Sequence, residues 1–319
     1  MVHPILKLVV QRVALGILLL LAASVLIFVG TQILPGDVAQ SILGQSATPV
    51  SLANLRAELG LNDPPVTRYF NWLSGVLQGD LGTALSNGQD IATAMGRRLG
   101  NTLFLAFWAA IIAVPLAIVL GLISVRYRDR WPDKLISGVT LATISVPEFL
   151  VGYIAVFFLA VQLQWFPSIA SVYDGMTLGE RLYAISMPVI VLVLAVLGHM
   201  MRMTRAAILN VMQSAYVETA ELKGLSQFTI IARHALPNAV APVVNVVMLN
   251  LAYLVVGVVV VEVVFVYPGM GQYLVDHVAK RDVPVVQACG LVFAAVYIGL
   301  NLLADVISIL ANPRLRHPK

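Results

Sequence analysis

Residues 211–242 read VMQSAYVETAELKGLSQFTIIARHALPNAVAP and stand between two long apolar runs of the chain. Residues 211–223 are suited to a helix throughout, and Gly224 interrupts it because glycine accepts a positive φ at little cost. Ser226 is a suitable cap for a second short helix, which we expect Pro237 to end. The stretch therefore predicts a helix–glycine–helix element held between two apolar segments.

The whole chain is as apolar as the runs that flank this element. It has 319 residues, of which 59% are hydrophobic and only 11% are charged. A soluble domain carries about 25% charged residues, so this composition indicates a protein embedded in a lipid bilayer. The single cysteine, Cys289, excludes an intrachain disulfide and a cysteine-based metal site.

Six apolar segments are long enough to cross a bilayer. A spanning helix needs about 20 mostly apolar residues, and its backbone polar groups must be paired within the segment. The first run is too long for a cleaved signal peptide and is expected to be an uncleaved span. We therefore predict an all-α integral membrane protein with six transmembrane helices. The expected spans are Val13–Leu34, Thr102–Val125, Leu135–Leu163, Tyr183–Met201, Ala239–Val266 and Val283–Ala311.

Lysine and arginine are distributed unequally between the two sides of these spans. Thirteen of the 20 basic residues fall on the side that carries both termini and residues 211–237. The positive-inside rule then predicts cytoplasmic N- and C-termini. The formal net charge of +4 is read as a topology signal, and we expect no nucleic-acid partner.

The spans divide the chain into three parts. Residues 1–34 form the cytoplasmic N-terminus and first span, residues 35–98 an external helical segment, and residues 99–319 a five-helix core. Within the external segment we expect one short amphipathic helix over Ser51–Gly60, capped by Ser51, and another over Val66–Leu77. These helices either pack on the membrane face or offer a docking surface to an external partner.

The loop between the fourth and fifth spans has a family resemblance. Its residues resemble, in type and spacing, the "EAA loop" of binding-protein-dependent ABC importers, in which this element is the coupling helix seated in a groove of the ATPase subunit. Thr219 stands where that family often has alanine, and His234 where it often has isoleucine. By this resemblance the ATPase-coupling residues are Glu218, Thr219, Ala220, Gly224, Leu236 and Pro237.

Further motifs extend the resemblance over nearly the whole chain, and their order resembles the first of the two permease types in the dipeptide/oligopeptide/nickel family. They are Pro35-Gly36-Asp37, Gly79-Asp80-Leu81-Gly82, His234 to Asn238, Val260-Val261-Glu262, Pro268 to Gly271, Arg281 to Gln287 and Asn312-Pro313-Arg314. The resemblance implies a type I ABC importer fold in a bacterial inner membrane. It also implies a second homologous permease subunit, two ATP-binding subunits at the loop, and an external solute-binding protein.

The chain carries no nucleotide-binding motif of its own. A G-x-x-x-x-G-K-[ST] phosphate loop is missing, and no Gly-Lys pair occurs in the sequence. We therefore expect no catalytic site, metal site or cofactor on this chain. ATP and Mg are expected on partner ATPase subunits.

Polar residues inside the spans are candidates for a translocation path, because a charge there costs at least about 2.5–3.5 kcal/mol on insertion scales. Pro147 is expected to open the third span next to Glu148, and the resemblance suggests that residues 267–282 dip into the mouth of the path. The alternative for each charged residue is a structural pair or a side chain that reaches the membrane interface, and we favour this alternative for Asp305. The candidates for the path or its gate are Glu148, Glu262, Asn245, Asn250, Tyr253, Tyr267 and Met270.

Other interpretations remain open at this stage. The cluster of His199, Met200, Met201 and Met203 could form a metal path, although core packing is the simpler interpretation. Peptides are the leading substrate class, and family relatives carry nickel chelates, glutathione, opines or oligosaccharides. A self-sufficient secondary transporter would need an inverted repeat, and an intramembrane hydrolase a catalytic pair; neither is evident.

Overall fold

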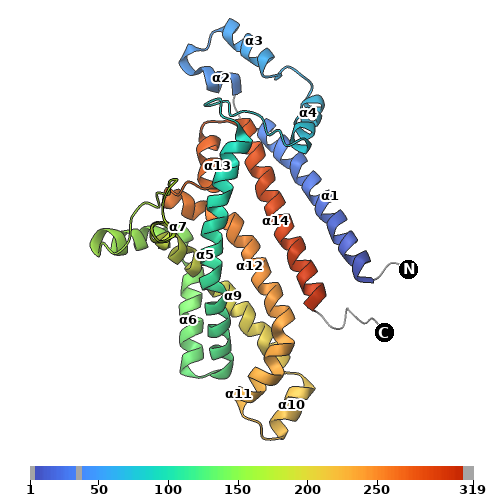
Figure 1. Ribbon diagram of the computed structural model, residues 1–319, viewed down its shortest axis with the longest axis vertical. Helices are drawn as coiled ribbons and strands as arrows, with labels where there is room; N and C mark the ends of the chain where they lie inside the picture. Colours follow the sequence, from blue (N-terminus) through green and yellow to red (C-terminus); the bar gives the residue numbers. More distant parts are fainter. Residues whose placement is uncertain (1–3, 34–37, 312–319) are drawn as a thin grey trace.

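The computed structural model describes residues 4–33 and 38–311, and helices make up its regular structure (Figure 1). The motifs at residues 35–37 and 312–314 lie outside the described residues. The all-α class is confirmed. The α-helices are α1 Pro4–Ile33, α2 Val38–Leu43, α3 Pro49–Glu58, α4 Pro65–Leu77, α5 Ile91–Arg126, α6 Trp131–Ser145, α7 Glu148–Ala155, α8 Leu178–Ala184, α9 Ser186–Met212, α10 Ala215–Leu222, α11 Gln227–Thr229, α12 Leu236–Val264, α13 Met270–Ala279 and α14 Val283–Ala311, with a 3-10 turn η1 Gly44–Ser46 and π-helical segments η2 Val156–Gln162 and η3 Ile230–Ala235.

Four helices are individually long and apolar enough to cross a membrane: α1, α5, α9 and α14. Two further candidates are bent pairs, one of α6 with α7 and η2, the other running from α11 through α12. The described residues therefore hold up to six spans if each bent pair counts as one. This agrees with the six segments predicted from hydropathy.

The third predicted span, Leu135–Leu163, is not one continuous helix, which corrects its expected shape. Its two halves are bent by 100° between Ser145 and Glu148. Proline lacks an N–H and disfavours helical geometry in the preceding residue, and Val146 is accordingly extended, with φ −95° and ψ 129°. Pro147 thus redirects the chain at the position where local opening was expected.

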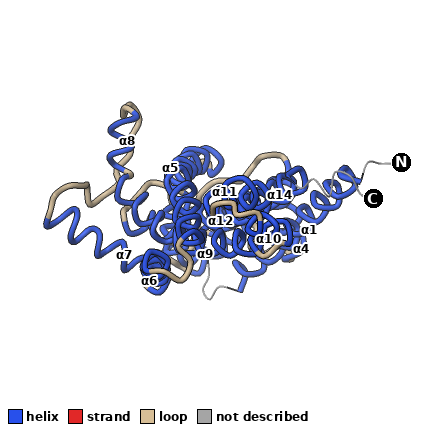
Figure 2. The backbone as a smooth tube through the Cα atoms, turned by 90° about the horizontal axis from the view of Figure 1, so that it is seen from below, coloured by secondary structure: helices blue, strands red, loops and turns tan. Residues whose placement is uncertain are grey.

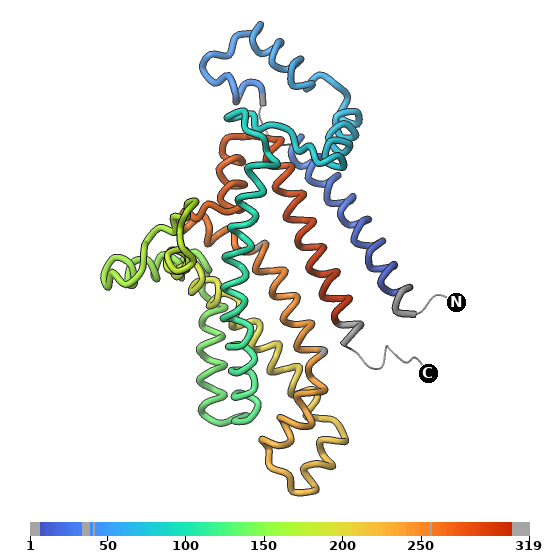
Figure 3. Tube along the Cα trace, in the orientation of Figure 1, coloured from blue at the N-terminus to red at the C-terminus, as the bar shows by residue number. Residues whose placement is uncertain are grey.

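The spanning helices pack in a connected order (Figure 3). Helix α5 packs on α9, α9 on α12, α12 on α14, and α14 on α1. Helices α2 to α4 lie at one end of the bundle, whereas α10 and α11 protrude at the opposite end (Figure 1). Seen along the bundle, α7 and α8 project at the edge opposite α1 (Figure 2).

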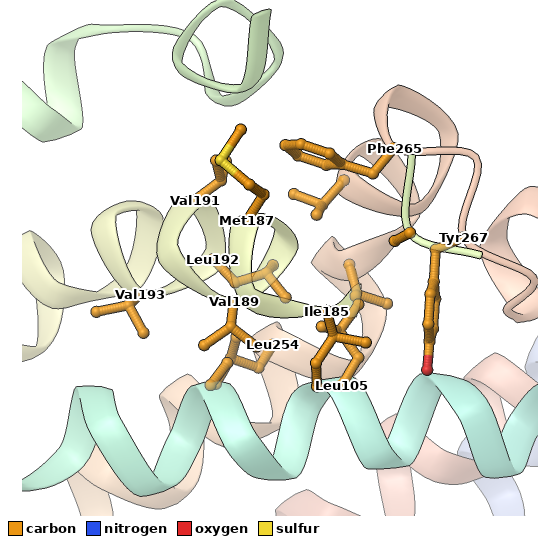
Figure 4. Close-up of a cluster of buried hydrophobic side chains, with 14 of the residues drawn as sticks. Leu105, Ile185, Met187, Val189, Val191, Leu192, Val193, Leu254, Phe265 and Tyr267 are labelled. Carbon is orange, nitrogen blue, oxygen red and sulfur yellow. The ribbon is translucent and has the colours of Figure 1, made fainter. Parts of the chain in front are cut away.

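The main buried cluster joins α5, α9 and α12 (Figure 4). Leu105 of α5 and Leu192 and Leu254 of α9 and α12 are among its fully enclosed side chains. By contrast, large apolar side chains of α1, such as Leu18 and Leu26, are mostly exposed, as expected for a surface that meets lipid. The core therefore lies around α9, and α1 is a peripheral span.

In the described part of residues 35–98, the main difference from the prediction is the residue that caps the N-terminus of α3. Thr48, not Ser51, caps α3: the Ser51 N–H donates to Thr48 Oγ1 at 3.1 Å, and the Thr48 N–H donates to Ser51 Oγ at 2.9 Å. Pro49 favours an earlier helix start because its fixed φ suits the first helical position. The second predicted helix is confirmed as α4.

Candidate functional site

The loop between α9 and α12 has the predicted glycine break but a different helix layout. Residues 211–223 are not one helix: α9 ends at Met212, Ser214 is extended, and α10 follows. Gly224 has φ +76°, and Ser226 caps α11 by accepting from the Thr229 N–H at 3.2 Å. Pro237 does not end the second helix, because it lies in the first turn of α12, where proline is tolerated.

Helix α10 has one buried face and one exposed face. Val217 and Ala220 pack against Ile230 of η3. Glu218 and Thr219 are exposed on the other side, and the Thr219 hydroxyl donates to the Ala215 carbonyl. The two halves of the loop are therefore held together by a small apolar contact, which leaves the acidic face open.

Large apolar side chains are also exposed on this protruding loop. Leu222 is 84% exposed and Phe228 62%, and Tyr216 and Leu225 are exposed as well. The Arg126 guanidinium lies 5.5 Å from the centroid of the Phe228 ring. The loop tip thus presents an apolar surface that the described part of the chain does not cover.

A charged cluster near this end of the bundle was missed by the sequence analysis. Asp133 of α6 is buried, and its Oδ2 accepts from Arg205 Nη2 of α9 at 2.8 Å. Ser124 of α5 donates to Asp133, and Arg205 Nε donates to Ser124 Oγ at 2.9 Å. The ion pair and the Ser124 hydroxyl together join α6, α9 and α5. Its signal in the sequence was an acid in the first turn of an apolar helix.

At the opposite end, Glu262 holds the hairpin between α12 and α14. Its carboxylate is fully buried and accepts from the Thr102 hydroxyl of α5 at 2.6 Å. It also accepts from the N–H groups of Gly271 and Gln272 at 2.7 and 3.2 Å, at the start of α13. A carboxylate at a helix N-terminus is stabilised by the free N–H groups and the helix dipole. We name this contact the Glu262 lock.

Two glycines make the lock possible. A Cβ on Gly269 would lie 2.0 Å from Glu262 Oε1, and a Cβ on Gly271 would lie 2.5 Å from the Val259 Cα. The requirement is space, because Gly269 has a negative φ of −101°. The backbone of the hairpin therefore approaches α12 more closely than any side chain would allow.

Tyr267 and Met270, two of the path candidates, are also completely buried in this hairpin. The Tyr267 hydroxyl donates to the Asn101 carbonyl at 2.9 Å, and the Met270 N–H donates to the Thr102 hydroxyl at 2.9 Å. Burial raises the pKa of Tyr267 to about 12. These two residues and Glu262 therefore converge on Asn101 and Thr102, in the third turn of α5.

The remaining path candidates do not converge on one site. Asn250 is buried and donates to the Val246 carbonyl of its own helix, whereas Asn245 and Tyr253 are exposed. Glu148 is half-buried at the start of α7. Within the described residues, no hydrogen bond or ion pair links Glu148 to Asn245 or Tyr253. Their place in a path remains a prediction.

Asp305 and the methionine cluster have simpler placements. Asp305 Oδ2 pairs with Arg12 Nη1 at 3.0 Å, which joins α14 to α1 and confirms a structural pair. His199 is exposed, whereas Met200 and Met201 are buried, so the three side chains do not face one common site.

A cavity of about 830 Å³ lies beside the hairpin, between the first turns of α5, the 172–176 loop and Pro268. Arg97, Arg98 and Arg181 line it. The Arg181 guanidinium lies 4.0 Å from the centroid of the Phe104 ring and donates to Asn101 Oδ1 at 2.7 Å. This basic cavity was not predicted, because Arg181 is distant in the sequence from the adjacent Arg97 and Arg98.

The chain matches two family models. Residues 113–317 match the inner membrane component of binding-protein-dependent transport systems, and residues 5–106 match the N-terminal region of such membrane components. The two matches together cover both ends of the molecule, including the Glu262 lock and the α10–α11 loop.

Relatives and a solved structure agree with these matches. A putative peptide transport system permease protein of Brucella abortus is 35% identical over 311 residues, covering 97% of this chain and 99% of the relative. The glutathione transport system permease protein GsiC of Escherichia coli O6:H1 is 34% identical over 315 residues, with 97% and 98% covered. A chain of the MetNI methionine ABC transporter has a similar fold, with a TM-score of 0.50 and 16% identity, covering 70% of this chain and 96% of that one.

Proposed function

This chain belongs to the family of inner membrane components of binding-protein-dependent transport systems, and we propose that it carries peptides or similar small solutes across a bacterial inner membrane. It is a multi-pass permease subunit of an ABC importer with the type I fold, as the sequence motifs predicted. The relatives named for peptides and for glutathione, which is itself a tripeptide, support this substrate class.

The α10–α11 loop is the proposed contact with separate ATPase subunits. The observation that carries this assignment is the exposed apolar tip, with Leu222 84% and Phe228 62% exposed on a loop that protrudes beyond the bundle. Such a surface is costly in water and favours a protein partner. Val217 and Ala220 pack α10 against η3, which continues directly into α12. A displacement of the loop tip would therefore be transmitted to α12. ATP and Mg would then act on the partner chains.

The same assignment supports the predicted topology. The connection from α5 to α6 and the α10–α11 loop lie at one end of the molecule (Figure 1). These segments and the helix turns that adjoin them carry Arg126, Arg128, Arg130, Lys134, Lys223 and Arg233. By the positive-inside rule this end is cytoplasmic, so α2 to α4 and the hairpin lie outside. That outer end would receive solute from a binding protein.

A second, homologous permease subunit is the proposed neighbour of α7. The 100° bend turns this helix sideways, so that one face packs on α9 and α12 while the helix projects at the edge of the bundle (Figure 2). Phe149, Tyr153 and Phe157 are exposed along α7 and η2. Exposed aromatic side chains along one helix add little to the stability of an isolated chain, but they can be buried against another subunit. The two permeases would then form the walls of a path between them.

Reconstitution of the complex tests this function. The chain, its neighbouring permease, the ATPase subunits and the binding protein are placed together in proteoliposomes with a labelled dipeptide. We expect uptake that requires ATP and every subunit. Uptake by this chain alone, without an ATPase, would instead support a self-sufficient transporter and contradict the proposal. Labelled glutathione in the same assay separates the two peptide classes.

A further inference from the structure

A second cavity, of about 760 Å³, lies between the end of α1, the start of α4 and the connection from α13 to α14. We call it the interfacial cavity. It is separate from the basic cavity near Arg181, and it takes no part in the proposed transport path or in the ATPase contact. Its lining combines basic side chains such as Arg68 and Arg281 with apolar ones such as Phe28 and Trp72.

Aromatic side chains place this cavity at the boundary between lipid and water. The Phe28 ring of α1 lies 5.4 Å from the Tyr69 ring and 6.0 Å from the Trp72 ring of α4, centroid to centroid. Ser24 and Tyr69 share a hydrogen bond of 2.9 Å. Tyrosine and tryptophan gather at this depth because each combines an apolar body with a polar group. Helix α4 thus lies against α1 where the apolar run of the span ends.

Arg68 has an unused donor inside the cavity wall. Its Nη2 donates to Gln32 Oε1 at 2.7 Å, whereas its Nε is buried and has no hydrogen-bond partner among the described residues. A buried donor left unpaired costs about 1–3 kcal/mol. The Arg68 guanidinium, which lines the cavity, therefore has hydrogen-bonding capacity that the described residues do not use.

The cavity also has an excess of positive charge. Even without Arg56, its lining holds two arginines, Arg68 and Arg281, against one acid, Asp63, which gives 2 − 1 = +1. Arg281 forms no ion pair with another described residue, and its neighbour Asp282 is occupied by the N–H groups of Leu85 and Ser86 at 3.2 and 2.9 Å. An anion is thus the ligand that the charge favours.

We propose that the interfacial cavity binds the headgroup of an anionic phospholipid, with its phosphate between Arg68 and Arg281. Guanidinium groups bind phosphate oxygens through paired, charge-assisted hydrogen bonds. The apolar part of the lining, which includes Phe28, Trp72 and Val286, would cover the glycerol and the first acyl carbons. Free phosphate has no apolar part, so it would leave these apolar side chains exposed to water. Exposed Val66 and Phe70 on α4 would lie among the neighbouring acyl chains.

Thermal unfolding in nanodiscs tests this site on the full-length chain in its purified complex. Nanodiscs of phosphatidylcholine alone are compared with nanodiscs that also contain phosphatidylglycerol. We expect phosphatidylglycerol to raise the Tm of the wild type by several degrees, and Arg68→Gln and Arg281→Gln each to lose most of this gain. Arg97→Gln is the matched control, since Arg97 is an exposed arginine, 75% accessible, that does not line this cavity.

Native mass spectrometry gives a readout that does not depend on stability. Phosphatidylglycerol should remain bound to the wild type and to Arg97→Gln, and should be lost from both cavity variants. An equal gain in Tm and equal retention in all four proteins would overturn the proposal. So would an equal gain from inorganic phosphate in phosphatidylcholine nanodiscs, because the ligand would then be free phosphate.

Discussion

The carboxylate of Glu262 on α12 accepts a hydrogen bond of 2.6 Å from the Thr102 hydroxyl on α5, across 160 residues of sequence. The same carboxylate holds the first N–H groups of α13. One buried side chain therefore fixes the hairpin to two spans at the proposed outer end. An acid placed in this way stabilises the packing of the hairpin on α5 and α12 directly.

Removing the acceptor oxygens of the lock should destabilise the protein. Glu262→Gln places an amide donor among donors, and Glu262→Ala leaves the Thr102 hydroxyl and two N–H groups unpaired. We expect a loss of about 1–3 kcal/mol for each unpaired buried group. Thermal unfolding in detergent measures the loss, with exposed Glu221→Gln on α10 as the control. A Tm equal to that of the control in both variants would show that the lock adds no stability.

The space beside Glu262 predicts a second effect. Gly269→Ala would bring a methyl group to 2.0 Å from Glu262 Oε1, so the hairpin must move. We expect a cost of about 1–3 kcal/mol, as for other overpacked sites. Gly96→Ala on α5 is the matched control because its Cβ would meet nothing within 4 Å, and alanine favours a helix by up to about 1 kcal/mol. Equal melting of the two variants would contradict the close approach.

The ion pair at the opposite end should depend on both of its members. Arg205→Met leaves the buried Asp133 carboxylate without its charge partner, and we expect a loss of about 3 kcal/mol. Asp133→Asn combined with Arg205→Met should recover part of this loss, since no buried charge then remains. Arg128→Ala, whose ion pair with Asp129 is largely exposed, should cost under about 1 kcal/mol. A double variant less stable than Arg205→Met would refute this account.

Changes in the protruding loop should separate transport from folding. Glu218→Lys with Gly224→Asp reverses an exposed charge and strains a residue at φ +76°. We expect ATP-driven uptake to be abolished while membrane insertion and the amount of protein stay unchanged. Arg128→Glu, an exposed charge reversal on the connection from α5 to α6 and outside the loop, is the control and should transport normally. Normal uptake by the loop variant would remove the loop from the coupling role.

Local sequence determined the elements whose causes are local. Spans follow from about 20 apolar residues in a row and from the need to pair backbone groups in lipid, and both requirements can be read without knowing any neighbour. The break at Gly224 and the cap at Ser226 depend on single residues and their immediate neighbours. The bend at Pro147 was foreseen as a local opening, but its angle of 100° was not.

Only the tertiary structure decided which polar groups meet. Thr102 and Glu262 are 160 residues apart, and Asp133 and Arg205 are 72 apart. A helix that is apolar on all sides has no periodicity that marks its packing face. The sequence by itself therefore determined the spans, the family and the projecting loop. The Glu262 lock, the ion pair and the two cavities depend on the orientation of each helix about its own axis and on which helices pack together. Polar groups cannot be paired by lipid, so each needs a partner on a neighbouring helix, and local sequence does not identify that neighbour.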